Sequence, residues 1–129
     1  MGMSAEGASY DNQEPHKRLV AWQRSVDFVV VVYELTRKLP KEEEFGLKSQ
    51  LRRASVSVPS NIAEGLTRKS KNDKVHFLNM AQGSVSEIDT QLIVCVKLGY
   101  IHDGVYEETR PRIVEIEKLL SGLINKLGG

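Results

Sequence analysis

The chain has 129 residues, a formal net charge of +1, and apolar and charged fractions of 40% and 27%. This length supports one hydrophobic core and therefore a single domain. The near-neutral charge excludes a general attraction to nucleic acid, so any such preference must come from local clusters of charge. No apolar run approaches the roughly 18 residues of a membrane-spanning helix. The single cysteine excludes an internal disulfide and is typical of the reducing cytoplasm, where we expect the protein to reside.

Residues 1–16 are small, polar and without periodicity, which predicts a disordered N-terminal arm ahead of one helical domain at 17–129. The first helix is expected over residues 17–38. Its polar residues recur at steps of four, seven and four along one narrow stripe: Gln23, Asp27, Glu34 and Lys38. Most other positions are apolar, including Val29 to Val32. A face this wide exceeds what one bundle core needs, so it predicts contact with another copy of the chain.

The second helix is expected over residues 43–67, where apolar residues share one face: Leu47, Leu51, Ala54, Val58 and Ile62. Pro59 falls inside this segment. Proline lacks a backbone donor and clashes one turn back, which predicts a kink.

The third and fourth helices carry apolar seams with alternating steps of three and four, a spacing typical of helix bundles. The third is expected over residues 72–98, with Ser70 or Asn72 as its cap, and the fourth follows a turn at 100–104. Pro111 predicts a kink in the fourth helix, or a restart capped by Thr109 or Arg110. The seam of the third helix comprises Leu78, Ala81, Val85, Ile88, Leu92, Cys95 and Gly99, and that of the fourth comprises Tyr106, Thr109, Ile113, Ile116, Leu120, Leu123 and Leu127.

Three short connections between long helices force neighbouring helices to run antiparallel. The sequence therefore predicts an all-α fold, an antiparallel up-down-up-down four-helix bundle.

Catalytic and metal-binding patterns are missing from the sequence. His16, His76 and His102 are scattered, and no Glu-x-x-His pair of the kind that builds a diiron site is present. Cys95 lies on an apolar seam, which favours a small buried hydrophobe over a catalytic nucleophile. We therefore expect no catalytic residue, no metal and no cofactor, and a protein that is not an enzyme.

Positive charge is concentrated between residues 48 and 74, where seven cations face two carboxylates for a net charge of +5, whereas the rest of the chain is net −4. The candidate nucleic-acid-binding residues are Lys48, Arg52, Arg53, Arg68, Lys69, Lys71 and Lys74. Flexible cations of this kind can contact phosphates. No aromatic residue is interleaved among them, which argues against stacking on single-stranded bases. The alternative interpretation is a solvated corner between two helices.

A lane of polar residues runs beside the apolar seam of the second helix: Arg53, Ser57, Asn61 and Glu64. One hypothesis is a buried or interfacial hydrogen-bond network, completed by Glu87 or Asp89 of the third helix, that fixes helix register or subunit pairing. The alternative is an ordinary solvent-facing surface.

One continuous stretch makes the chain recognisable. Residues 40–65 read PKEEEFGLKSQLRRASVSVPSNIAEG, preceded by Trp22, and the string from Ser57 to Gly65 is the most specific part. Later matching positions are Phe77-Leu78, Ala81 to Ser84, Glu87, Gln91-Leu92 and Leu98 to Ile101. Across about residues 19–127 the chain resembles the bacterial four-helix-bundle family named for 23S rRNA intervening sequences, which is related in fold to retroelement accessory proteins.

This resemblance implies a four-helix protomer that assembles into a ring-like homo-oligomer, often a pentamer, with no established catalytic activity. The expected function is a non-catalytic homo-oligomeric module that binds RNA or an RNA–protein complex through the basic residues. The rival hypothesis is a purely structural scaffold for protein–protein contacts. The two differ in their response to salt, because phosphate contacts release counterions.

Overall fold

The computed structural model describes residues 19–128, and this part of the chain is helical without strands. Its elements are α1 (Val20–Thr36), the short 3₁₀ turn η3 (Lys41–Glu43), α2 (Leu47–Leu66), α3 (Lys71–Lys97) and α4 (Asp103–Lys126). The predicted all-α fold is confirmed. The expected disordered arm at 1–16 lies outside the described residues.

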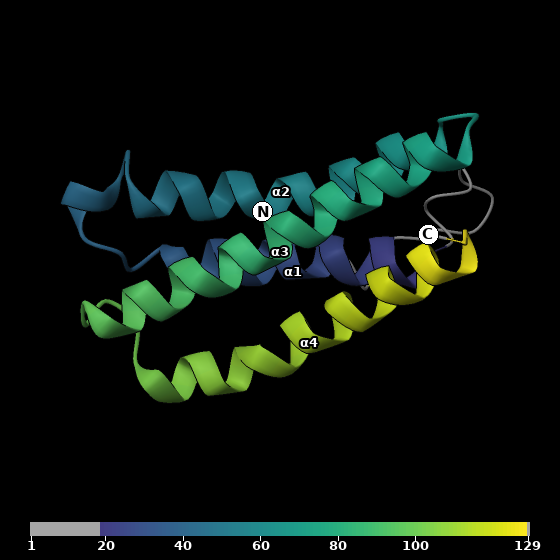
Figure 1. Ribbon diagram of the computed structural model, residues 1–129. Coiled ribbons are helices and arrows are strands. Elements are labelled where there is room, and N and C mark those ends of the chain that lie inside the picture. Colours follow the sequence, from purple (N-terminus) through teal and green to yellow (C-terminus); the bar gives the residue numbers. More distant parts are fainter. Residues whose placement is uncertain (1–18, 129) are drawn as a thin grey trace.

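The four helices form an antiparallel up-down-up-down bundle (Figure 1). Helix α2 packs against α1 and α3, and α4 closes the bundle by packing against α3 and α1. The interface between α2 and α3 is the most extensive, and that between α1 and α4 is the smallest. Long helices joined by short turns leave no other economical arrangement.

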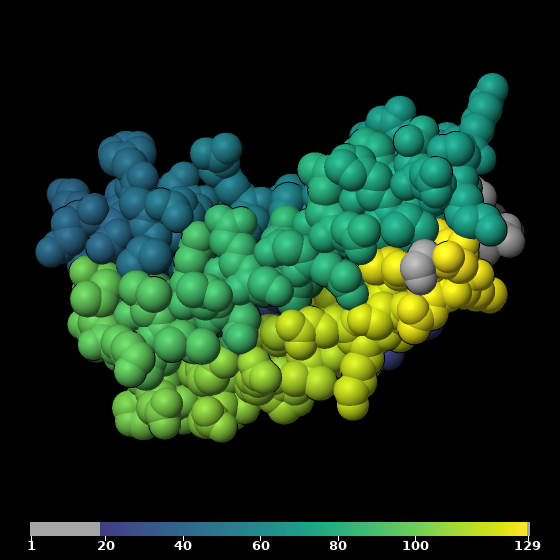
Figure 2. Space-filling view, viewed as in Figure 1, coloured from purple at the N-terminus to yellow at the C-terminus, as the bar shows by residue number. Residues whose placement is uncertain are grey.

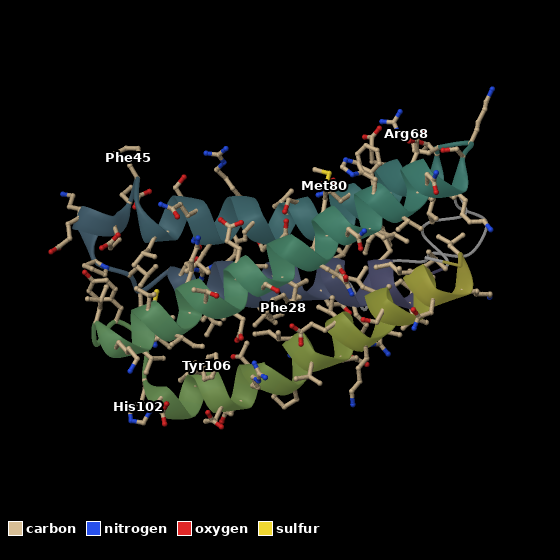
Figure 3. All side chains as sticks on the ribbon, viewed as in Figure 1. Phe28, Phe45, Arg68, Met80, His102 and Tyr106 are labelled. Atoms are coloured by element: carbon tan, nitrogen blue, oxygen red, sulfur yellow. The ribbon has the colours of Figure 1, made fainter. Side chains whose placement is uncertain are left out.

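The apolar seams predicted from periodicity form the core. Six of the seven predicted seam residues of the third helix are buried, from Leu78 to Cys95. The seventh, Gly99, is exposed, because it lies in the turn after the end of α3. Helix α1 contributes Phe28, which lies between the helices at the centre of the bundle (Figure 3). The main core residues of the other two helices are Leu51, Val58 and Ile62 of α2 and Ile113, Ile116 and Leu120 of α4. Burial of each such side chain contributes roughly 1.5–3 kcal/mol.

The apolar surface of α1 is only partly covered within one chain. Its buried face includes two hydroxyl residues, Ser25 and Thr36, whose side chains donate to carbonyls one turn back, Ala21 O at 2.6 Å and Val32 O at 2.8 Å. On other sides of the helix, Val20 and Val30 remain 46% and 49% exposed. Part of the broad apolar face of this helix therefore meets solvent in the single chain.

Helix ends follow recognisable capping chemistry. Ser70 caps α3, because its Oγ accepts from the backbone N–H of Asp73 at 3.1 Å. At the other end, Gly99 has φ of +81°, and the N–H of Tyr100 donates to Cys95 O at 2.9 Å. This left-handed C-terminal turn is the one that glycine adopts at least cost.

The two prolines that fall within predicted helices lie inside continuous helices. Pro59 is within α2 and Pro111 within α4. The alternative of a restart capped by Thr109 or Arg110 is wrong. Helix α4 begins at Asp103, where His102 Nδ1 accepts from the N–H of Gly104 at 3.0 Å. Thr109 is a mid-helix residue whose hydroxyl donates to Val105 O at 2.8 Å.

Candidate nucleic-acid interface

The seven predicted cations fall into two groups at opposite ends of α2. Arg52 and Arg68 are 16 positions apart, or about 24 Å along a helix axis, and Figure 3 places Arg68 far from Phe45, which marks the other end. The first group comprises Lys48, Arg52 and Arg53, and the second comprises Arg68, Lys69, Lys71 and Lys74. The basic segment therefore supplies two patches rather than one.

The first group lines a groove of about 630 Å³, called here the α2 groove. Three elements meet in it: α1, the segment that follows η3, and α2. Its lining residues are Tyr33, Glu44, Phe45, Lys48, Ser49, Arg52, Arg53, Val56 and Ser57. In Figure 2, the side chains around the start of α2 (blue) stand out from the upper edge of the molecule.

Arg52 is held firmly in the α2 groove. Its guanidinium lies 4.4 Å from the ring centroid of Tyr33, a cation–π contact. Its Nε donates to Thr36 Oγ1 at 2.9 Å and its Nη2 donates to Tyr33 O at 3.3 Å. A guanidinium has five N–H donors, so others remain for a ligand.

Lys48 and Arg53 are less constrained. Lys48 Nζ pairs with Glu44 Oε1 at 3.1 Å one turn away, and the side chains of Lys48 and Glu44 are 17% and 52% exposed. Arg53 is exposed and makes no hydrogen bond or ion pair with the described residues. The groove therefore presents one fixed and two adaptable cations.

Phe45 is the most exposed large apolar residue described, at 94%, and Figure 3 shows its side chain directed away from the bundle. The segment that carries it is anchored by Glu43, whose Oε1 accepts from the N–H of Leu47 at 3.0 Å. Its Oε2 accepts from the hydroxyl of Tyr100 at 3.2 Å. A Cβ at Gly46 would meet Glu43 Oε1 at 2.6 Å, so glycine lets this carboxylate close over the helix start.

The predicted start of the second helix, at residue 43, is therefore wrong by four residues. Residues 41–43 form a 3₁₀ turn, and Gly46 has φ of −109° and ψ of −114°, outside the helical region. Phe45 thus lies in a connection rather than on a helix face. The glycine that follows it was the sequence signal for this break.

The second group is partly committed to the structure of the turn. Arg68 Nη2 pairs with Glu64 Oε2 at 2.7 Å, and its guanidinium lies 4.7 Å from the ring centroid of Phe77. Lys74 Nζ donates to Leu66 O at 3.4 Å. Lys69 and Lys71 are exposed and have no hydrogen bond or ion pair among the described residues. These two are the cations of the corner that are available to an outside anion.

The predicted polar lane is three separate groups rather than one network. The hydroxyls of Ser57 and Ser84 lie 2.6 Å apart across the interface of α2 and α3, and Asn61 Nδ2 donates to Ser57 O at 2.9 Å. Glu64 pairs with Arg68 instead. Gln91 Nε2 donates to Glu87 Oε2 and to Gln50 Oε1, both at 3.1 Å. Arg53 belongs to none of these groups.

Asp89, the alternative partner of the lane, faces α4 instead. Its carboxylate accepts from the hydroxyl of Tyr106 at 2.7 Å and from Arg110 Nη1 at 3.0 Å. Burial, with this hydrogen bond adding to it, raises the pKa of Tyr106.

The buried Cys95 has the chemistry of a core residue. Burial raises the pKa of its thiol to about 11, and the negative charge of Glu43 adds to this effect. The thiol therefore stays protonated at neutral pH, whereas nucleophilic cysteines are thiolates. Within residues 19–128, no three His, Cys, Asp or Glu side chains gather as a metal site would require. Nor is any described helix long and apolar enough to cross a membrane.

Comparison with known proteins gives a consistent picture. The family model described as 23S rRNA-intervening sequence protein matches residues 17–122. Among solved structures, the chain is similar to a protein of unknown function from the S23 ribosomal protein family of Bacteroides thetaiotaomicron VPI-5482, with 29% identity and a TM-score of 0.74. The match covers 81% of this chain and 98% of the other. No curated protein matches the chain.

Proposed function

The chain belongs to the 23S rRNA-intervening sequence protein family, and we propose that it is a non-catalytic, cytoplasmic homo-oligomer that binds RNA or an RNA–protein complex. The cations of the α2 groove and of the corner between α2 and α3 make the contacts. The proposal extends to this chain the link with ribosomal RNA that the family name states.

The observation that carries this proposal is the segregation of charge. Residues 48–74 have a net charge of +5 and the remainder of the chain −4. Arg53, Lys69 and Lys71 are exposed and make no hydrogen bond or ion pair among the described residues. Cations with this freedom can displace the counterions that surround a phosphate backbone. An anionic partner is therefore drawn to α2 and its corner rather than to the acidic remainder.

Exposed apolar residues on α1 support the homo-oligomer in this proposal. Val20 and Val30 are about half exposed on α1, and such apolar surface favours burial against another copy. A closed ring, with five copies as the resemblance implies, repeats each basic patch in every subunit. Repetition multiplies weak contacts through avidity.

A protein scaffold is the second candidate. Helix α3 carries exposed apolar residues towards its C-terminal end, with Ile93 and Val94 both 38% exposed and Leu98 following at 54%. Apolar surface of this kind suits a protein partner better than a phosphate backbone. In this case the cations are solvated and contribute little.

Salt dependence separates the two candidates. Binding of the full-length protein to a labelled single-stranded RNA is measured by fluorescence anisotropy from about 50 to 200 mM salt. The proposal expects micromolar affinity that falls steeply over this range with little sequence preference. Absence of RNA binding at the lowest salt contradicts the proposal and favours the scaffold.

A further inference from the structure

The α2 groove combines aromatic rings with cations. The basic segment, residues 48–74, contains no aromatic residue, which is why the sequence alone argues against base stacking. Tyr33 arrives from α1 and Phe45 from the connection before α2. Their rings share the groove with Lys48, Arg52 and Arg53. Folding therefore supplies the aromatic component that the linear sequence lacks.

We propose that the α2 groove binds single-stranded RNA, with an unpaired base stacked on the ring of Phe45 and adjacent phosphates held by Arg53 and Lys48. This inference rests on the proposed function and specifies which of the two basic patches binds an unpaired strand. The corner between α2 and α3 then supplies only non-specific electrostatic attraction.

Phe45 is suited to stacking because its ring is accessible and its backbone is fixed. The side chain is 94% exposed, so both faces of the ring are open to a base. Glu43 fastens the connection through Leu47 N–H and the Tyr100 hydroxyl, at 3.0 and 3.2 Å. A preorganised platform loses less conformational entropy on binding. Stacking on aromatic rings tolerates any base, since every base has a π-face.

The cations of the groove are placed to hold phosphates beside that ring. Lys48 and Arg53 are five positions apart, or about 7.5 Å along the helix. Arg53 makes no hydrogen bond or ion pair among the described residues. Lys48 can exchange its ion pair with the exposed Glu44 for one with a phosphate. Arg52 keeps its contacts with Tyr33 and Thr36, and the remaining N–H groups of its guanidinium are available to a ligand. Three cations against one carboxylate give the groove a positive balance that complements a nucleic-acid strand.

The test uses a single-stranded RNA that carries the fluorescent base 2-aminopurine, together with a duplex of the same sequence. Stacking on Phe45 is expected to change the 2-aminopurine emission when the wild-type protein binds. Phe45→Ala should weaken single-strand binding by about 5- to 150-fold and leave duplex binding unchanged, and Phe45→Trp should preserve it. The matched control is Ile93→Ala, which removes an exposed apolar side chain outside the groove.

The outcomes separate the groove from the proposed function. If Phe45→Ala binds the single strand like the wild type while salt-dependent binding persists, the groove assignment is wrong and the proposed function stands. If the wild type binds no RNA at low salt, both are wrong. If Phe45→Ala lowers the oligomeric mass and RNA affinity falls with it, Phe45 is a contact between copies of the chain, which also overturns the assignment.

Discussion

The carboxylate of Glu43 accepts the backbone N–H of Leu47, the first residue of α2, at 3.0 Å. The same side chain accepts from the hydroxyl of Tyr100 at 3.2 Å, so it joins the start of α2 to the turn before α4. One residue thereby caps a helix and ties together two connections at the same end of the bundle. It also positions the segment that bears Phe45.

The first prediction concerns this cap. Glu43→Ala removes the acceptor of Leu47 N–H and should lower the free energy of unfolding by about 0.5–2 kcal/mol, the range measured for lost helix caps. Glu42→Ala is the matched control, because Glu42 is exposed and makes no hydrogen bond among the described residues. Urea denaturation gives both values. Equal stability of the two variants would show that the cap contributes nothing.

The second prediction concerns the hydroxyl pair between α2 and α3. Ser84→Ala removes the partner of Ser57, which lies 2.6 Å away, and should lower the free energy of unfolding by about 0.5–1.5 kcal/mol. Asn61→Ala should have a smaller effect, because its amide donates to Ser57 O within the same helix. Ser60→Ala, at an exposed position of α2, is the control. A double-mutant cycle of Ser57 and Ser84 without coupling energy would contradict this account.

The third prediction concerns the thiol of Cys95. Because burial raises its pKa to about 11 from an ordinary 9.0, the folded state holds this proton at a pH where the unfolded chain releases it. The unfolded state then binds fewer protons, so the free energy of unfolding should fall as pH rises from 9 towards 11. Cys95→Ala should show a shallower fall over this window. An unchanged slope, measured by urea denaturation at each pH, would argue against the buried thiol as its source.

The fourth prediction concerns assembly. Val30 is 49% exposed on α1, and a lysine there should oppose burial of this surface against another copy. Light scattering of the wild type is expected to give a multiple of 14.5 kDa, and Val30→Lys a smaller mass. Asn79→Lys adds the same charge at an exposed position of α3 and should leave the mass unchanged. A wild-type mass of 14.5 kDa at micromolar concentration would rule out the homo-oligomer.

The core was predictable from the sequence because its signal is periodic. The seam predicted from Leu78 to Gly99 alternates steps of three and four, and all of its residues except Gly99 are buried. Residue type narrowed the cap of α3 to Ser70 or Asn72, and the structure has Ser70. Burial in a bundle depends on which face a residue occupies, and spacing along the chain determines that face.

The α2 groove was less predictable because it depends on contacts between distant segments. Phe45 falls inside the helix expected from residue 43, although Gly46 is a local signal of the break. The hydrogen bond that joins Glu43 to Tyr100 has no local signal, because the two residues are 57 positions apart. The contact of Arg52 with Tyr33 joins two helices and has no local signal. The pairing of Glu64 with Arg68 did have one, because opposite charges four residues apart attract on a helix.

The central claim is that exposed cations of α2 and its corner bind RNA, and charge reversal tests it most directly. The variant carrying Arg53→Glu, Lys69→Glu and Lys71→Glu reverses three of the seven candidate cations, those that make no hydrogen bond or ion pair among the described residues. Arg68 is left intact, because its pairing with Glu64 supports the turn. The matched control, Lys97→Glu, Lys118→Glu and Lys126→Glu, makes the same charge change at exposed positions of α3 and α4.

Fluorescence anisotropy with a labelled single-stranded RNA at about 50 mM salt gives the decisive comparison. The account predicts micromolar binding by the wild type and the control, no binding by the reversed variant, and equal oligomeric masses for all three proteins. Equal affinity of the reversed variant and the control would contradict it.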